Sequence, residues 1–368
     1  MPRALLVSKP LEAPWNDSSK NLVRDLAGAL PAHDVVPTVL VREGGRSPSP
    51  SVAILEAYPR RSRGLPGLAD QGMAFARLLA RGARGRARRG HDLWHFFFAP
   101  NPRGSRAAEA LARASGRPSV QTVCSEPPPG NPQPWLFGDR IVVLSARVER
   151  RLLDAGVAPS RLRRIPPPVP DLATPTEAQR LAARGRFQLP SAAPLVVYPG
   201  DLEFGRGAYL VLEAFARLHT EGAQLVMACR AKTARAREAE RELRTKATEL
   251  APGRVHWVGE TPAIHALLGA ADVVALPTDT LYAKMDYPLA VLEAMRMSRA
   301  VVVAAHTAAA ELAGPLGAAP AVEVSDIDIG ELAALHEGRV GQGEGTGSIA
   351  ASGAQRAADN MTERGGGG

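Results

Sequence analysis

Short runs of β-branched and other apolar residues alternate along the chain with longer amphipathic stretches rich in Ala, Leu, Arg and Glu. The short runs predict strands and the longer stretches predict helices. This alternation is typical of α/β proteins, in which helices cover a mainly parallel sheet. In the first half of the chain, we predict the strands Ala4–Ser8, Val35–Val41, Leu93–Phe98, Ser119–Val123 and Ile141–Leu144. The helices predicted between several of them are Ser19–Leu30, Leu68–Ala83 and Ser105–Ser115.

A proline-rich segment interrupts the alternation near the middle of the chain. Four prolines occur between Arg164 and Pro170, and proline can neither donate a backbone hydrogen bond nor continue a helix. After a short predicted helix, Thr176–Arg186, the alternation restarts at Leu195–Tyr198 as if from a new first strand. The later predicted strands are Gln224–Met227, Val255–Val258, Val273–Leu276 and Ala300–Val303.

The restart predicts two doubly wound α/β domains facing a cleft. We place an N-terminal domain at residues 1–165, a hinge at 166–185 and a C-terminal domain at 186–338. Ligands of such sheets bind beyond the carboxyl ends of the strands, so we expect the chemistry there. Residues 339–368 are rich in glycine and predict a flexible segment and tail, with one short helix at Ile349–Arg364.

The 368 residues carry a formal net charge of +8, and almost all of the positively charged residues are arginines. Six arginines gather between Arg77 and Arg89, where a predicted helix ends. One interpretation is a solvated helix end that suits the helix dipole. The other is a peripheral contact with anionic lipid headgroups. Nucleic acid is disfavoured as a partner, because neither a recognised binding motif nor interleaved aromatic residues accompany the charge.

Other features narrow the class of protein. No run approaches the ~20 apolar residues that span a bilayer. The first residues resemble a strand more than a signal peptide. Cys124 and Cys229 have no metal or redox spacing. No Gly-x-Gly-x-x-Gly follows the first strand, and there is no Walker loop. We therefore expect a cytoplasmic enzyme without a cofactor or metal, or one bound peripherally at the inner membrane face.

Three segments carry candidate chemistry. In the first, Gly200 and Gly207 flank a turn into a helix, and Arg206 there suits a phosphate. In the second, Arg230 and Lys232 follow a predicted strand. In the third, Glu293 lies inside a helix that begins at proline, where a carboxylate can accept hydrogen bonds from hydroxyl groups. Taken alone, each segment is equally compatible with an ordinary structural interpretation. This is a β–α turn for the first segment, an exposed charge pair for the second and a solvent-facing carboxylate for the third.

In this order, the three segments resemble the second domain of retaining glycosyltransferases of family 4, which have the GT-B fold. The resemblance rests on Gly200-Asp-Leu…Arg206-Gly207, on Leu212-Glu-Ala-Phe215 and on Pro288…Leu292-Glu-Ala-Met295. It extends over about residues 140–305 and is weak before them. It implies a nucleotide-diphosphate sugar as donor and transfer with retention of anomeric configuration, the leaving group being stabilised by cations and amides without a metal.

The resemblance also implies roles for individual residues. Arg206 stands where the family has a lysine on the donor diphosphate, and Glu293 corresponds to the glutamate that holds the donor ribose hydroxyls. Pro288 and Leu289 correspond to the helix start whose amides face the phosphates. The full predicted donor site is Gly200, Arg206, Gly207, Arg230, Lys232, Pro288, Leu289 and Glu293.

The chain departs from the family pattern at the two positions predicted to be catalytic. The first acidic residue of the family's motif is Met285 here, and the adjacent Asp286 is our predicted substitute. His95 remains from a family His-x-His, whose second histidine is Phe97. These departures mark a divergent member. They also keep two alternatives open, a non-catalytic nucleotide-sugar-binding protein and a nucleotide-sugar 2-epimerase. The acceptor stays open as a glycan, a lipid-linked molecule or a small molecule.

Overall fold

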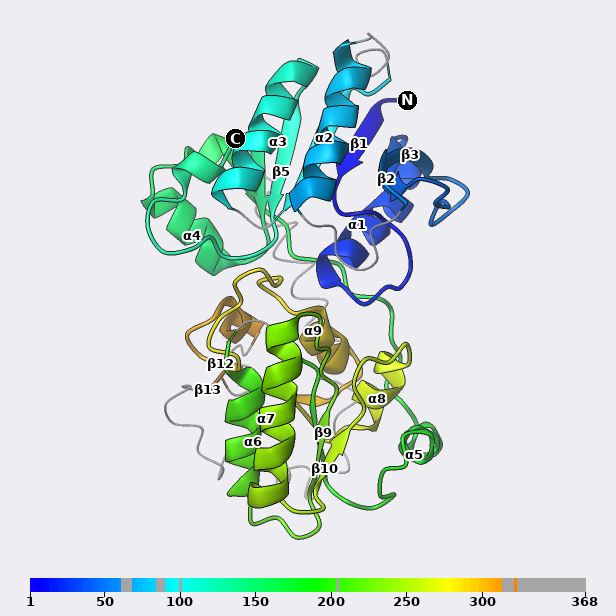
Figure 1. Cartoon of the computed structure of the whole chain (residues 1–368), viewed down its shortest axis with the longest axis vertical. Coiled ribbons are helices and arrows are strands. Elements are labelled where there is room, and N and C mark those ends of the chain that lie inside the picture. Colours follow the sequence, from blue (N-terminus) through cyan, green and yellow to red (C-terminus); the bar gives the residue numbers. More distant parts are fainter. Residues whose placement is uncertain (61–67, 84–89, 99–100, 203–204, 313–320, 323–368) are drawn as a thin grey trace, which may run out of the picture. The chain divides into compact units, whose positions relative to one another are not determined.

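The computed structural model describes residues 1–368 apart from 61–67, 84–89, 99–100, 203–204, 313–320 and 323–368. The described residues form two compact units, each with its own parallel sheet (Figure 1). The first unit comprises Met1–Pro170, Asp279–Leu292 and a stretch beginning at Ala305. The second comprises Asp171–Thr278, Glu293–Ala304 and a short terminal strand.

The first unit is built on a seven-stranded sheet of order β3-β2-β1-β4-β5-β6-β7. The order reverses between β1 and β4, which is the topological signature of a doubly wound sheet. Its strands are β1 (Arg3–Val7), β2 (Val36–Arg42), β3 (Ala53–Tyr58), β4 (Leu93–Phe98), β5 (Ser119–Val123), β6 (Arg140–Val143) and β7 (Leu162–Arg164). Its helices are α1 (Ser18–Ala29), α2 (Leu68–Ala83), α3 (Pro102–Ser115) and α4 (Ala146–Asp154), with short 3₁₀ turns at Leu30–His33, Gln133–Trp135, Pro159–Arg161 and Ala308–Leu312.

Helices cover both faces of this sheet, so alternate residues of β1 enter two separate cores. Leu5 and Val7 pack with residues of α2 and α3. Ala4 and Leu6 pack with α1, and Met285 and Leu289 from the later part of the chain join the same cluster. Burial on both faces explains why the central strands are continuous apolar runs rather than alternating ones.

The second unit has a six-stranded sheet of order β10-β9-β8-β11-β12-β13, which reverses between β8 and β11. Every residue of β8, β11 and β12 is buried. Helices α6 and α7 lie side by side (Figure 1). The strands are β8 (Leu195–Tyr198), β9 (Gln224–Met227), β10 (Val255–Trp257), β11 (Val273–Leu276), β12 (Ala300–Ala304) and β13 (Ala321–Val322). The helices are α5 (Glu177–Arg186), α6 (Gly207–Ala216), α7 (Ala234–Leu250), α8 (Ile264–Ala270) and the part of α9 (Leu289–Arg296) from Glu293 onwards.

The two doubly wound α/β units confirm the predicted fold class, and the differences from the predicted elements are local. Helix α3 begins at Pro102 rather than at Ser105, because the side chain of Asn101 caps it by accepting from Gly104 N. Strands β3, β7 and β13 were not predicted. Strand β3 is largely exposed, and β7 has only three residues, two of them arginines. The predicted helix at Ile349–Arg364 lies outside the described residues.

Candidate functional site

The point where the strand order of the second sheet reverses, between β8 and β11, carries the first predicted segment. Gly207 begins α6 there and lies against the end of β11. A Cβ atom at Gly207 would lie 2.9 Å from the hydroxyl oxygen of Tyr198 and 3.1 Å from Cα of Thr278. Only glycine therefore lets the first turn of α6 approach β11 this closely. The N–H groups of that turn lie at the edge of the sheet where doubly wound proteins bind ligands.

Tyr198, the last residue of β8, packs against the loop that contains Gly200. Its side chain is 1 % exposed. A Cβ atom at Gly200 would lie 2.2 Å from Cζ of the ring, so the loop backbone rests directly on the tyrosine. The phenol O–H donates to the carbonyl of Asp201 over 3.4 Å. Sequence reasoning missed this role, although a tyrosine that ends an aliphatic strand before Pro-Gly was an available signal.

The second predicted segment lies at the same edge, after β9. Asp201 and Arg230 form an isolated parallel bridge, which continues the pairing of β8 and β9 beyond the ends of the strands. The bridge fixes the backbone of Arg230 beside the loop that contains Gly200. Nη1 of Arg230 is 3.8 Å from Oε1 of Glu260. Lys232 follows two residues later and is half-buried. The structure thus brings Gly200, Arg206, Gly207, Arg230 and Lys232 to the carboxyl edge of the second sheet.

Glu293 lies in α9 and is buried, with its side chain 10 % exposed. Its Oε1 is 3.1 Å from Nε2 of His265, near the start of α8. A carboxylate has about four acceptor positions, so one histidine leaves several of them for another donor. Glu293 was predicted from the sequence, whereas His265 was not. A lone histidine in a short apolar helix gave no signal that it would contact a carboxylate.

Asp286 belongs to the first unit, where it is fully buried. Its backbone N–H donates to the carbonyl of Cys124 over 3.0 Å, and its Oδ2 accepts from Oγ of Ser145 over 2.9 Å. Ser145 also caps α4 by accepting from Val148 N. Within the described residues, Oδ1 of Asp286 has no hydrogen-bond partner. Burial is the main cause that raises the pKa of Asp286 to about 7. The structure therefore places this carboxyl beside the N-terminus of α4.

Pro288 and Leu289 lie at the start of α9 and are both buried. The Pro288 carbonyl accepts from the N–H groups of Val291 and Leu292. The Leu289 side chain packs in the core of the first unit together with Met285. A methionine therefore fills an apolar position where the family motif has an acidic residue.

His95, the other predicted catalytic residue, lies in β4 of the first unit. Its Nε2 is 2.7 Å from Oγ1 of Thr122, and its ring stacks on Phe97 with centroids 4.0 Å apart. Burial lowers the pKa of His95 to about 3. The imidazole is therefore neutral at physiological pH, and its hydrogen bond with Thr122 leaves one ring nitrogen for a further partner.

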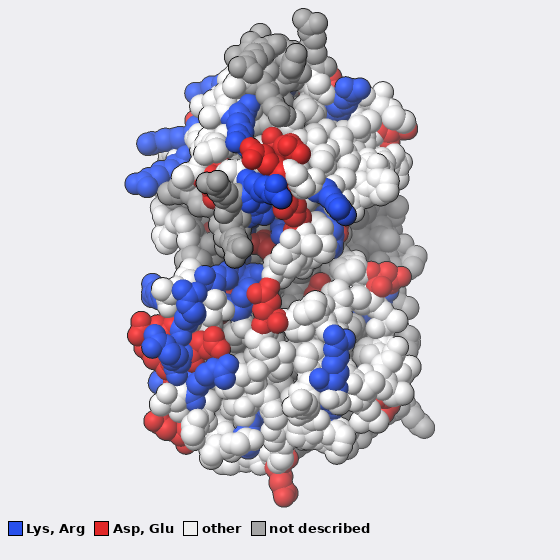
Figure 2. All heavy atoms as spheres, turned by 45° about the vertical axis from the view of Figure 1, so that its right-hand side comes forward, with Lys and Arg blue, Asp and Glu red and all other residues white. Residues whose placement is uncertain are grey.

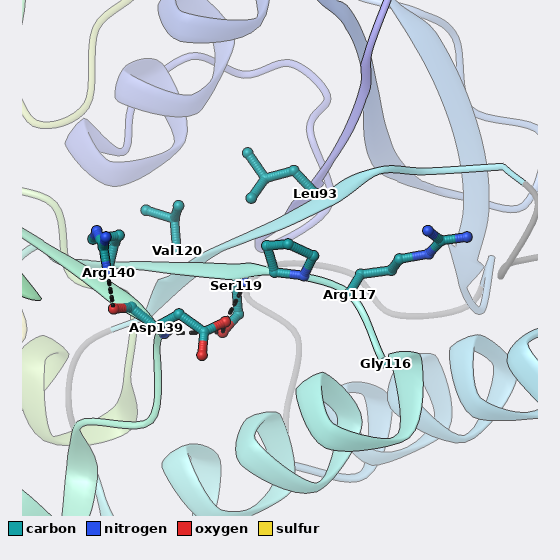
Figure 3. Close-up of a pocket in the computed structure, with 8 residues that line it drawn as sticks. Leu93, Gly116, Arg117, Ser119, Val120, Asp139 and Arg140 are labelled. Carbon is teal, nitrogen blue, oxygen red and sulfur yellow. Dashed lines mark hydrogen bonds between the residues drawn. The ribbon is translucent and has the colours of Figure 1, made fainter.

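A separate concavity of about 550 Å³ lies at the amino ends of β4, β5 and β6 (Figure 3). Leu93, Pro118 and Val120 contribute apolar walls to it. Asp139 at its border accepts from both the N–H and the hydroxyl of Ser119. The predicted site residues do not line this hollow, and ligands of doubly wound sheets bind at the opposite edge. We therefore do not assign the chemistry to it.

On the face seen in Figure 2, basic and acidic side chains are interspersed, and the described residues form no continuous stripe of one charge. Of the predicted arginine cluster, Arg77 pairs with Glu43 over 2.7 Å and donates to the Ala57 carbonyl. The side chains of the other five arginines, up to Arg89, lie outside the described residues. Among the helices that the structure describes, none is both long and apolar enough to cross a membrane. The same residues contain no group of three or more His, Cys, Asp or Glu arranged to hold a metal ion.

Residues 193–334 match the family described as Glycosyl transferases group 1, and this range includes strands β8 to β13. Among solved structures, HepE of Anabaena in complex with UDP and glucose is similar over 93 % of this chain and 90 % of its own, with 15 % identity and a TM-score of 0.70. Sucrose-phosphate synthase of Thermosynechococcus elongatus is similar over 93 % of this chain and 90 % of its own, with 17 % identity and a TM-score of 0.69.

A glycosyltransferase of Rickettsia africae is similar over 91 % of this chain and 87 % of its own, with 14 % identity and a TM-score of 0.67. No curated protein matches the chain at a significant level. Together with the two parallel sheets, these similarities show the two-domain, Rossmann-like GT-B fold of glycosyltransferases. The segment that matches a glycosyltransferase family includes both Arg206 and Glu293.

Proposed function

We propose that the protein is a glycosyltransferase that moves a sugar from a nucleotide-diphosphate sugar to an acceptor, with retention of anomeric configuration. The observation that carries the proposal is the carboxyl edge of the second sheet. There, a glycine-flanked loop, three basic residues and a buried carboxylate lie within a segment that matches Glycosyl transferases group 1. The structure of HepE with UDP-glucose supports a nucleotide sugar as the class of donor.

The chemistry of the donor explains this set of residues. As the bond between sugar and diphosphate breaks, negative charge builds on the leaving phosphate. Fixed cations and backbone N–H groups stabilise that charge without having to reorganise. In the proposal, Arg206, Arg230 and Lys232 supply the cations. The first turn of α6 supplies the amides, and the contribution of Pro288 and Leu289 stays a prediction. The proposed reaction needs neither a metal ion nor a cofactor.

Glu293 serves the other end of the nucleotide in this proposal, where it accepts hydrogen bonds from the ribose hydroxyls. A buried carboxylate bound by a single histidine has the acceptor capacity for two adjacent hydroxyl groups. Its burial makes the contact specific, because a ligand that lacks those hydroxyls would leave acceptors unpaired.

The acceptor side is assigned to the first unit, with His95 as the residue that orients an acceptor hydroxyl. With its pKa lowered to about 3, His95 is a weak base at neutral pH and suits orientation better than proton abstraction. Peripheral binding to anionic lipid through Arg77–Arg89 is part of the same proposal. Neutralising these arginines should reduce sedimentation with anionic vesicles in a salt-dependent way. Unchanged sedimentation would remove the lipid contact.

A panel of nucleotide sugars, incubated with the full chain and candidate glycan, lipid-linked and small-molecule acceptors, tests the proposal. Release of the nucleoside diphosphate reports turnover, and the proton NMR coupling of the anomeric position reports the configuration of the product. Retention is expected. An inverted product would contradict the stereochemical part, and conversion of a nucleotide sugar without any acceptor would identify a 2-epimerase.

A second candidate is a non-catalytic nucleotide-sugar-binding protein of the same fold. It is favoured by Met285, which packs in the core where the family motif has an acidic residue, and by the complete burial of Asp286. Binding of a nucleotide sugar without any turnover, across the whole acceptor panel, would support this candidate over the transferase.

A further inference from the structure

His265 lies against Glu293 at the carboxyl edge of the second sheet. Nε2 of His265 is 3.1 Å from Oε1 of Glu293. A carboxylate only accepts hydrogen bonds, so a hydrogen bond over this distance has the imidazole nitrogen as its donor. The two side chains differ in exposure, 10 % for Glu293 and 47 % for His265. One oxygen of the buried carboxylate is thus held by a side chain that borders solvent.

The pair is set by two helices rather than by a loop. His265 is the second residue of α8, which follows β10, and Glu293 lies in α9, which follows β11. The chain packs closely behind the pair, since a Cβ atom at Gly269 in α8 would lie 3.5 Å from the sulfur of Met297, just after α9. Sites built on packed helices hold their side chains more precisely than sites on loops.

We propose that His265 is a positioning residue of the nucleotide site, an inference that rests on the function proposed above. By donating to Oε1, His265 holds the glutamate in one rotamer and leaves Oε2 for the two adjacent hydroxyls of the donor ribose. A free glutamate side chain has several rotamers, and fixing one of them on binding costs free energy. A carboxylate that is already held binds the hydroxyls without that cost.

The test compares a ribonucleoside diphosphate with its 2′,3′-dideoxy analogue, titrated calorimetrically into the full chain. UDP, ADP and GDP are screened first, and the tightest binder is used with its dideoxy form. The variants are His265→Phe, which keeps a ring without the donor, and His265→Gln, which keeps an N–H donor. His256→Phe is the matched control, because His256 lies in the same unit and its ring nitrogen is 2.8 Å from Oε1 of Gln224.

The wild-type chain should prefer the ribonucleotide, and His265→Phe should reduce that preference by about tenfold. Affinity for the dideoxy form should stay within about twofold in His265→Phe, and His265→Gln and His256→Phe should keep the preference. An equal loss for both ligands, or no loss for either, would overturn the positioning role. If His265→Phe does not fold, His265→Ala replaces it in the same comparison. A wild-type chain that binds no nucleoside diphosphate would instead overturn the proposed function, and this inference with it.

Discussion

Replacing Asp286 with asparagine should stabilise the first unit at alkaline pH and have little effect at acidic pH. Burial is the main cause that raises the pKa of this carboxyl from its ordinary 3.8 to about 7. The folded state therefore binds the proton more tightly than the unfolded state. The contribution of Asp286 to the free energy of unfolding is greatest below pH 3.8 and falls as the pH rises towards 7, because only the unfolded chain releases the proton over that pH range. One pKa unit corresponds to ~1.4 kcal/mol, so the contribution lost between pH 5 and pH 8 is about 3 kcal/mol.

Asparagine removes this titration, and its side-chain oxygen can still accept from Ser145. Urea unfolding of wild type and Asp286→Asn is measured at pH 5 and pH 8, in a Trp257→Phe background. The remaining tryptophans, at 15, 94 and 135, then report on the first unit alone. The advantage of the variant should grow by about 3 kcal/mol from pH 5 to pH 8.

Asp154 provides the control, because it is exposed and lies in the first unit, so Asp154→Asn should show no such growth. If the free energies of unfolding of wild type and Asp286→Asn differed by the same amount at both pH values, the buried carboxyl would already be ionised at pH 5. Burial would then not raise its pKa.

Three further predictions concern the ligand sites. Arg206→Ala should weaken the binding of a nucleoside diphosphate by ~1.5–3 kcal/mol in a calorimetric titration and leave the binding of the free nucleoside unchanged. The control Arg237→Ala should change neither, and equal losses for both ligands in Arg206→Ala would contradict the phosphate role. Glu293→Gln should lower turnover or raise the donor KM by about tenfold, or ~1.4 kcal/mol, with an unchanged melting temperature. If the variant is largely unfolded but its folded molecules are fully active, Glu293 is structural. His95→Ala should raise the acceptor KM, and normal kinetics with a stable fold would remove His95 from the site.

The fold was largely predictable, because sheets covered on both faces produce apolar strands that periodicity detects. Strands such as Gln224–Met227 and Val273–Leu276 have the predicted bounds. Of the edge strands that the structure describes, β10 was predicted, whereas β3, β7 and β13 were not. Strand β3 is exposed along most of its length and carries Glu56, so its sequence lacks the buried run that marks a central strand. Helix starts shifted by one to three residues where a cap, such as Asn101, decided the boundary.

The candidate site was predictable only where glycine or charge recurs in an ordered motif. Gly207 and Arg230 were found because they follow predicted strands, and both lie at the carboxyl edge of the second sheet. The contacts of Tyr198 and His265 depend on neighbours far away in the chain, which a single sequence does not reveal. The same limit applies to Asp286, since its partner Ser145 is 141 residues away and the complete burial of the pair follows from tertiary packing.

We have placed the nucleotide of a sugar donor at the carboxyl edge of the second sheet. Calorimetric titration of UDP, ADP and GDP into the full chain is the decisive experiment, with the matching nucleosides, Glu293→Gln and Arg206→Ala measured beside them. We expect at least one diphosphate to bind once per chain, more tightly than its nucleoside and about tenfold more weakly in Glu293→Gln. If no diphosphate binds at millimolar concentration, or if binding is indifferent to Glu293 and Arg206, the donor site does not lie where we have placed it.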